Sequence, residues 1–362
     1  RAAAILAAAD AGQADKLAAI DLLARSGGAR ALARLTPAMS DTDAIVADRA
    51  KGAVAAINKE LAFRDTIQSI WYGISLGSVL LLAAIGLAIT FGVMGVINMA
   101  HGEMVMLGAY TTFVVQSLIL SSAPALAPYA LAFALPAAFL VSGTVGLLLE
   151  RGVIRFLYGR PLETLLATWG VSLVLQQLVR SLFGPTNKEV SNPSWMSGAF
   201  DLMGLTITYN RLWIVLFALA VFLVLLVVLK RTSFGLKMRA VTQNRGMAAS
   251  MGIRTPWVDA LTFALGSGIA GMAGVALSQI DNVSPNLGQN YIIDSFMVVV
   301  FGGVGNLWGT LVGAMTLGVV NKFLEPYTGA VLAKIAVLVV VILFIQKRPR
   351  GLFALKGRAV ES

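Results

Sequence analysis

The sequence predicts an all-α integral membrane protein: a polytopic helical bundle of about eight or nine transmembrane segments, preceded by a small helical N-terminal segment. Hydrophobic residues make up 57% of the 362-residue chain and charged residues only 13%, and the mean hydropathy is +0.80. Soluble domains contain about 25% charged residues, so an ordinary soluble enzyme is excluded. Several apolar runs also reach the ~20 residues that a helix needs to span a bilayer.

The N-terminal segment, residues 1–66, has a different composition. Alanine is frequent, charges of both signs recur at helical spacing, and Ile20, Leu23 and Leu35 belong to narrow apolar stripes. Ser26-Gly27-Gly28 interrupts these stripes. We expect short helix pairs like the end of a helical repeat array, too small for a core of their own; the alternative is a solvated helical tail.

Residues 67–357 form the predicted membrane domain, followed by a short tail, 358–362. A shorter apolar piece, 291–303, must cross the membrane or reach its middle. The full spans are predicted at 67–91, 103–121, 127–150, 162–183, 211–229, 257–280, 310–325 and 327–346.

The basic residues predict the orientation of these spans. Half of the 28 basic residues lie in three segments, around 151–160, 230–254 and 347–358, and the positive-inside rule places all three in the cytoplasm. The N-terminal segment is then periplasmic and the C-terminus cytoplasmic, in a bacterial inner membrane. Because these loops hold 14 basic residues and no acidic ones, the positive net charge of the chain indicates contact with membrane lipid rather than with nucleic acid.

The composition also limits the chemistry. Cysteine is absent and His101 is the only histidine, so a thiolate or His-rich metal site is excluded. A Ser-His-Asp triad would have to use His101.

Two predicted spans are interrupted by a similar glycine pattern. Phe91-Gly-Val-Met-Gly95 precedes Asn98, and Phe301-Gly-Gly-Val-Gly305 precedes Asn306. Paired glycine breaks in the two halves of a chain point to a transport site, whereas the alternative is that these glycines only let helices cross closely. The broken-helix glycines are Gly92, Gly95, Gly302, Gly303 and Gly305, and the candidate pathway residues are Thr90, Asn98, Thr168, Trp169 and Asn306.

The stretch Asn98 to Glu103 is the most polar one beside a span, and we place it at the cytoplasmic end of the first span. Glu103 would begin a helix, where its charge favours the positive end of the dipole. His101 and Glu103 could form a gate or proton relay. Alternatively, His101 caps the turn or pairs with Glu103.

The loop 230–256 suits one short amphipathic helix at 240–251 that ends at Gly252. A short helix of small residues between spans can dock into a soluble partner, and the alternative is a basic helix lying on anionic lipid. Its candidate contact residues are Gln243, Asn244, Arg245, Met247, Ala248, Met251 and Gly252.

Several motifs in order resemble the branched-chain amino acid type of ABC transporter permease, across residues 67–357. They are Ser75-Leu-Gly-Ser78, the run Leu87 to Gly108, the loop Gly235 to Ile253, Leu261 to Gly266, and Arg348 to Phe353. Within that family the run Gly86 to Tyr110 and the outside N-terminal extension are most similar to urea permeases.

The resemblance implies a high-affinity bacterial uptake system with a periplasmic binding protein, two different permease subunits and two ATPase subunits. It also implies that Val241–Gly252 is the helix that couples to the ATPase. The chain has no G-x-x-x-x-G-K-[ST] loop, so we expect it to bind no cofactor itself, with ATP and Mg on the ATPase subunits.

These observations predict a non-enzymatic permease that moves urea from periplasm to cytoplasm, assisted by a periplasmic urea-binding protein. Urea is small and neutral, and it needs amides, hydroxyls and carbonyls rather than a charged cage. One alternative is a branched-chain amino acid permease, whose zwitterionic substrate would need helix N-termini or charges for its carboxylate. The others are an ion-coupled secondary transporter and an intramembrane enzyme, for which few catalytic groups are available.

Overall fold

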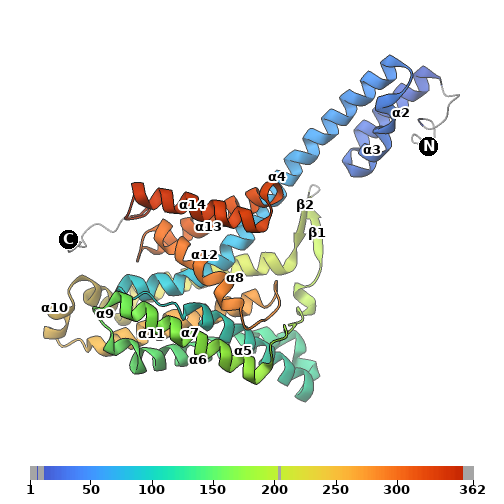
Figure 1. Cartoon of the computed structure of the whole chain (residues 1–362). Helices are drawn as coiled ribbons and strands as arrows, with labels where there is room; N and C mark the ends of the chain where they lie inside the picture. Colours follow the sequence, from blue (N-terminus) through green and yellow to red (C-terminus); the bar gives the residue numbers. More distant parts are fainter. Residues whose placement is uncertain (1–5, 7–11, 203–204, 354–362) are drawn as a thin grey trace. The chain divides into compact units, whose positions relative to one another are not determined.

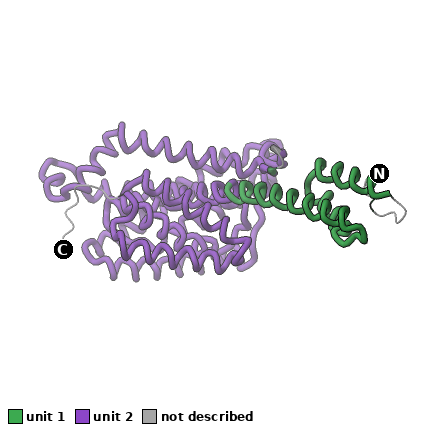
Figure 2. The backbone as a smooth tube through the Cα atoms, turned by 90° about the horizontal axis from the view of Figure 1, so that it is seen from above, with its two compact units in different colours: residues 1–70, 202–205 green, residues 71–201, 206–362 purple. Residues whose placement is uncertain are grey.

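The computed structural model describes residues 6, 12–202 and 205–353. The predicted tail 358–362 and the basic residues Lys356 and Arg358 lie outside this part. The chain divides into two compact units, residues 1–70 with 202–205 and residues 71–201 with 206–362 (Figure 2).

Unit 1 is a small group of helices with a core of its own. It contains α2 (Gln13–Ser26), α3 (Gly28–Leu35), the short helix η1 (Pro37–Ser40) and the first part of α4 (Ala44–Met94). Ile20 and Leu35 are fully buried in a cluster that also contains Val46 and Ala50. The N-terminal segment therefore buries a small apolar cluster among its own helices, to which several alanines contribute.

Unit 2 is a helical bundle (Figure 1). Eight of the described helices are long and apolar enough to cross a membrane, and α12 is shorter, which confirms the predicted polytopic all-α fold. After α4, the helices long enough to span are α5 (His101–Ser122), α6 (Ala130–Gly152), α7 (Pro161–Phe183), α8 (Tyr209–Arg231), α11 (Thr255–Leu277), α13 (Leu307–Thr328) and α14 (Ala330–Lys347). The shorter helix α12 (Leu287–Gly302) lies between α11 and α13 in the sequence.

Short elements connect the spanning helices. They are the 3-10 helices η2 (Pro124–Tyr129), η3 (Ile154–Phe156) and η4 (Ser194–Met196), the strands β1 (Ala199–Leu202) and β2 (Leu205–Thr208), and the helices α9 (Ser233–Gln243) and α10 (Arg245–Ser250). The two strands pair with each other, and the sequence did not predict them.

The α4 helix runs through the boundary expected near residue 66 and has residues in both units. Its sequence contains neither glycine nor proline between Gly52 and Gly73, so nothing in the local sequence ends the helix there. The membrane part of α4 and the helix α11 are the most buried of the spanning helices.

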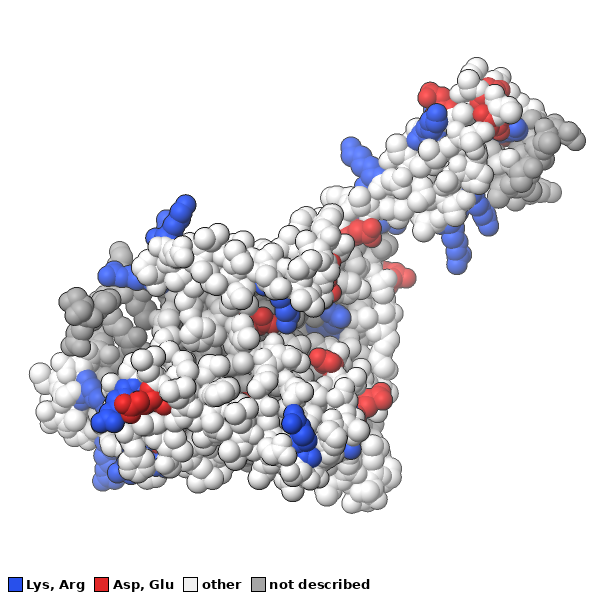
Figure 3. Space-filling view, viewed as in Figure 1, with Lys and Arg blue, Asp and Glu red and all other residues white. Residues whose placement is uncertain are grey.

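Glycines let the central helices of unit 2 approach closely. A Cβ at Gly108 of α5 would overlap the backbone of Gly271 in α11, and one at Gly274 would overlap the carbonyl oxygen of Val105. The small-residue face that contains Ala270 and Gly274 therefore packs within the chain, as such faces do in membrane proteins. Most of the surface of unit 2 that Figure 3 shows carries no charged side chain, as a bilayer requires.

Candidate functional site

A row of polar side chains runs along one face of α7. Thr164, Thr168, Ser172 and Gln176 follow one another at intervals of four residues, and all four are buried. Residues four apart lie on the same face of a helix. The opposite face is apolar and exposed at Leu166, Trp169 and Leu173, as expected of a helix whose outer side meets lipid or another membrane chain.

Glu103, in the first turn of α5, faces this row. Its exposed fraction is 1%, and its Oε1 accepts hydrogen bonds from Ser172 Oγ at 2.9 Å and from Gln176 Nε2 at 2.7 Å. Its Oε2 is buried and has no hydrogen-bond partner among the described residues. We call Glu103 together with Thr164, Thr168, Ser172 and Gln176 the polar seam.

The chain enters the seam through an irregular segment after α4. Gly95 has a φ of +68°, where only glycine is free of strain. The N–H of Met99 donates to Thr168 Oγ1 at 3.1 Å, and the N–H of Ala100 donates to Asn98 Oδ1 at 3.0 Å. Non-helical backbone at membrane depth must be satisfied by protein in this way.

The placement of the stretch Asn98 to Glu103 at the cytoplasmic end of the first span is therefore wrong. Glu103 meets Ser172, the middle residue of α7, and His101 meets Ala83, in the middle of the membrane part of α4. The chain turns back at Gly95 and re-enters the bundle, which hydropathy cannot reveal because the residues involved are few and partly polar.

His101 is buried on the other side of α5. Its Nε2 lies 2.8 Å from the carbonyl oxygen of Ala83, so we assign the proton to Nε2. Its Nδ1 is then an acceptor, and no described residue donates to it. The side chain neither caps the helix, whose N-cap is Ala100, nor pairs with Glu103, whose partners are on α7.

Two helices begin beside each other next to Glu103. A Cβ on Gly102 of α5 would overlap the carbonyl oxygen of Gly288 of α12, and a Cβ on Gly288 would overlap the carbonyl oxygen of Gly102. The N-terminal ends of both helices carry partial positive charge. Their closeness stabilises a negative charge on Glu103, for which no ion pair occurs in the described part of the chain.

The two predicted glycine breaks lie next to each other, and the contact between them is made by backbone atoms. A Cβ on Gly92 would lie 2.6 Å from the Cα of Gly305, and one on Gly302 would overlap the carbonyl oxygen of Gly309. Gly303 and Gly305 adopt φ angles of +105° and +79°. This geometry favours the close-crossing alternative, because packed backbone leaves no space for a solute at these positions.

The other candidate pathway residues lie outside the seam. Thr90 is buried and donates to the carbonyl oxygens of Gly86 and Leu87 in its own helix. Asn306 caps α13 by accepting from the N–H groups of Trp308 and Gly309, as asparagine commonly does. Trp169 is half exposed on the outer face of α7. Among the five candidates, Thr168 belongs to the seam and Asn98 borders it.

Sequence analysis missed Ser172 and Gln176. Their four-residue spacing from Thr168 was the available signal, but it lies within a leucine-rich run that also fits a helix exposed to lipid on all sides. The described residues contain no group of three or more histidines and carboxylates that could hold a metal ion.

The predicted single helix at 240–251 is two helices, α9 and α10. Asn244 separates them because its Oδ1 accepts from the N–H of Met247 at 2.9 Å and so caps α10. Met247 and Met251 are exposed, but Ala248 is buried in the core of the bundle. Of the seven predicted contact residues only Ala248 is therefore buried, and Met247 and Met251 are the large apolar side chains among the exposed ones.

A charged cluster joins α10 to the neighbouring helices. Arg245 forms an ion pair with the buried carboxylate of Asp259, at the start of α11, and its guanidinium lies 5.0 Å from the ring centroid of Tyr158. The hydroxyl of Tyr158 donates to Glu150 Oε1 at 2.8 Å. Burial, reinforced by the charge of Asp259 and the bond to Glu150, raises the pKa of Tyr158 far above its usual range.

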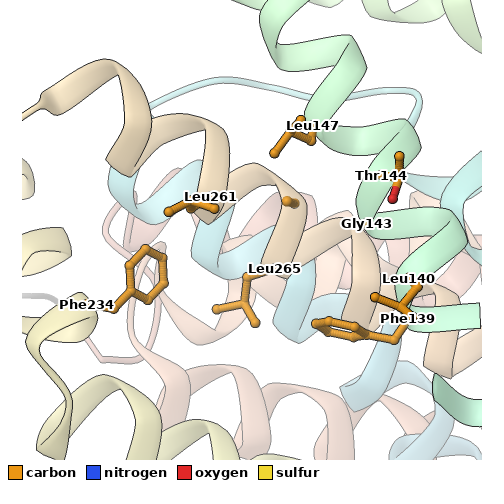
Figure 4. A pocket seen from close by; sticks show the side chains of 9 residues that line it. Phe139, Leu140, Gly143, Thr144, Leu147, Phe234, Leu261 and Leu265 are labelled. Carbon is orange, nitrogen blue, oxygen red and sulfur yellow. The ribbon is translucent and has the colours of Figure 1, made fainter.

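The structure also contains an apolar hollow, which is separate from the polar seam. It has a volume of about 380 Å³ and lies between α6, α9 and α11, with Phe139, Leu147 and Phe234 in its lining (Figure 4). Thr144 supplies the only polar side chain of that lining. Such a surface suits acyl chains or an apolar helix face and cannot satisfy a polar solute.

Comparison with known proteins gives consistent similarities. Residues 69–346 match the family described as "Branched-chain amino acid transport system / permease component". The chain is 29% identical over 293 residues to the high-affinity branched-chain amino acid transport system permease protein BraD of Pseudomonas aeruginosa, covering 79% of this chain and 95% of that protein. It is 29% identical over 295 residues to the corresponding protein LivH of Escherichia coli, covering 79% and 94%.

A shorter similarity, 31% identity over 111 residues, links it to the ribose import permease protein RbsC of Bacillus subtilis and covers 29% of this chain and 34% of that protein. No solved structure matches the chain.

Proposed function

The chain belongs to the permease family of branched-chain amino acid transport systems, and from this premise we propose that it is the membrane subunit of an ATP-driven bacterial importer. The observation that carries the proposal is the polar seam, a set of buried hydrogen-bonding groups at mid-span in an otherwise apolar bundle. Polar groups at membrane depth are expensive, so they are retained where a solute or ion passes.

The seam suits a small polar solute. Its four members on α7 recur every fourth position from Thr164 to Gln176. At a rise of 1.5 Å per residue the row therefore covers about 18 Å. Three hydroxyl groups and one amide lie along it, and the carboxyl group of Glu103 faces its last two members. A neighbouring helix shift of a few ångströms would expose this row and the free Oε2 of Glu103 to a passing molecule.

A branched-chain amino acid is the first candidate substrate, because BraD and LivH are named for that activity. The helix N-termini that meet at Gly102 and Gly288 provide the positive ends that an amino acid carboxylate would need.

Urea is the second candidate. The run Gly86 to Tyr110 resembles urea permeases, and the N-terminal unit lies before the family match, which begins at residue 69. Glu103 already lies beside these two helix N-termini, so its carboxyl group would crowd a second carboxyl group there, which favours a solute that has none.

The partners follow from the same proposal. ATP would be hydrolysed by two ATPase subunits that contact α10 through Met247 and Met251. A second permease subunit would cover part of the exposed apolar helix faces, and a periplasmic protein would deliver the solute. The basic loops favour a cytoplasmic position for α10 and the C-terminus.

Uptake in a strain that lacks its own transport systems tests the proposal. The complete transporter would be expressed with radiolabelled leucine or urea outside, and each solute would be tested as a competitor of the other. A transporter with inactive ATPase subunits is the control. ATP-dependent uptake of either solute supports the importer and identifies the substrate, whereas uptake that continues with inactive ATPase subunits would support the secondary transporter instead.

A further inference from the structure

A small polar pocket lies in unit 2, between the segments that follow α7 and α11. In the predicted orientation this end of the bundle faces the periplasm. Its volume is about 230 Å³. Ser278 and Gln279, just after α11, are buried within it, while the other polar residues of its lining are exposed at its rim: Glu189, Asn192, Asp281 and Asn282.

Gln279 has an unused acceptor. The exposed fraction of the residue is 5%, and its Nε2 donates to Ser278 Oγ at 3.1 Å. Its Oε1 is buried and accepts from no group in the described part of the chain. A buried amide oxygen without a donor is energetically unfavourable, so a ligand that supplies an N–H would remove this penalty.

The charges of the rim select the type of ligand. Glu189 and Asp281 contribute two carboxylates, which attract cations and N–H donors and repel anions. Lys188 does not neutralise them directly, because its Nζ lies 6.0 Å from the ring centroid of Phe113 instead. The pocket is therefore rich in acceptors and suits a small group that presents several N–H bonds.

The walls of the pocket are tied to the two helices that carry the polar seam. Lys188 and Val283 exchange two backbone hydrogen bonds, of 2.8 and 2.9 Å. Arg180, four residues beyond Gln176 on α7, donates to Asn286 at 3.0 Å. Gln116 of α5 bonds the backbone of Ser191 in both directions. A movement of α5 or α7 would therefore change the shape of the pocket.

We propose that this pocket binds the ammonium or amide N–H groups of the transported solute before the solute enters the polar seam. The inference rests on the proposed importer function. Leucine offers an ammonium group and urea offers two amide groups, so the shared recognition chemistry is N–H donation to the Gln279 oxygen and to the two rim carboxylates.

Binding can be measured separately from transport. The complete permease–ATPase complex in lipid nanodiscs, without the binding protein, would be titrated with leucine, urea and acetate while ligand signals are followed by saturation-transfer NMR. We expect leucine or urea to bind and acetate, which has no N–H, not to bind. The Gln279→Leu variant should bind about three- to tenfold more weakly, as expected for the loss of one hydrogen bond.

Three further variants complete the test. Gln279→Glu keeps an acceptor and should retain or strengthen binding of an ammonium group. Glu189→Gln combined with Asp281→Asn should weaken leucine binding more than urea binding, since only leucine carries a positive group. Asp201→Asn removes an exposed carboxylate in β1, outside the pocket lining, and should change nothing.

Unchanged binding by Gln279→Leu would overturn the proposal. So would a wild-type complex that binds neither solute although the complete transporter takes one of them up. If Gln279→Leu fails to assemble, the combined variant Glu189→Gln and Asp281→Asn serves as the test. Affinities for both solutes equal to those of the wild type would then also overturn the proposal. An absence of uptake together with specific binding would count against the importer function, not against the pocket.

Discussion

Glu103 is a carboxylate in the middle of a membrane bundle, and its surroundings reduce what its burial costs. Two hydrogen bonds from α7 reach Oε1, and the N-termini of α5 and α12 lie beside it. Oε2 has no protein donor among the residues described. One oxygen of the carboxyl group is thus held by α7, while the other is an acceptor enclosed in the bundle without a donor from the described residues.

Replacing Glu103 with Gln is expected to reduce uptake at least tenfold while leaving the amount of protein in the membrane within about twofold. The amide oxygen can still accept from Ser172 and Gln176, so the fold keeps its hydrogen bonds, but the negative charge and the free acceptor are lost. The measurement is uptake per membrane-inserted molecule. Glu163→Gln, at the exposed start of α7, is the matched control, and equal uptake by the two variants would exclude Glu103 from the pathway.

Gly92 tests the contact between the two glycine breaks. An added methyl group would lie 2.6 Å from the Cα of Gly305, and backbone cannot move aside cheaply, so Gly92→Ala should destabilise the protein by about 1–3 kcal/mol. Gly170→Ala is the control, since nothing lies within 4 Å of its added Cβ and alanine favours the helix.

Thermal unfolding in detergent would compare these two variants. A lower midpoint for Gly92→Ala and an unchanged or higher midpoint for Gly170→Ala are expected. Normal stability with lost uptake in Gly92→Ala would instead restore the pathway interpretation of this glycine.

At the scale of the element, α7 shows the reverse of the pattern found in soluble proteins. Its polar face is buried and its apolar face is exposed, because the medium outside is lipid. The segment was predictable as a span from its apolar character. The partner of its polar face was not predictable. Glu103 lies 69 positions before Ser172 and 73 positions before Gln176 in the chain, and their contact depends on the turn at Gly95.

The helix α10 and its C-cap residue present two exposed methionines, Met247 and Met251, beside the buried Ala248, and these positions should respond differently to a carboxylate. Met251→Asp should leave the thermal midpoint unchanged and abolish solute-stimulated ATP hydrolysis, because a charge would be buried in an apolar contact with the ATPase. Ala248→Asp should lower the midpoint, because Ala248 lies in the core of the bundle. Normal stimulation in a stable Met251→Asp complex would remove α10 from the ATPase contact.

At the scale of the whole molecule, the spans were predictable because hydropathy is a local property and each long apolar run must cross the bilayer. The short helix α12 and the start of α5 were harder. Both begin inside the bundle at Gly288 and Gly102, and their depth is set by contacts with distant helices rather than by their own composition. The same limit applies to the site: Thr168 could be named from its residue type, whereas the pairing of Glu103 with Ser172 and Gln176 is seen only in the folded chain.

The orientation of the molecule is the property that connects the pocket, the seam and α10 into one direction of transport. The basic residues around 151–160, 230–254 and 347–358 predict that α10 and the C-terminus are cytoplasmic, and in that orientation the end of α7 at Phe183 and the polar pocket face the outside. Alkaline phosphatase is active only outside the inner membrane. A phosphatase fused after Lys356 should therefore be inactive, and one inserted within 122–126 should be active, with fusion protein levels measured as the control. The reverse pattern would turn the molecule over: α10 could then not meet a cytoplasmic ATPase, and the pocket would face the solute after it had crossed the membrane rather than before.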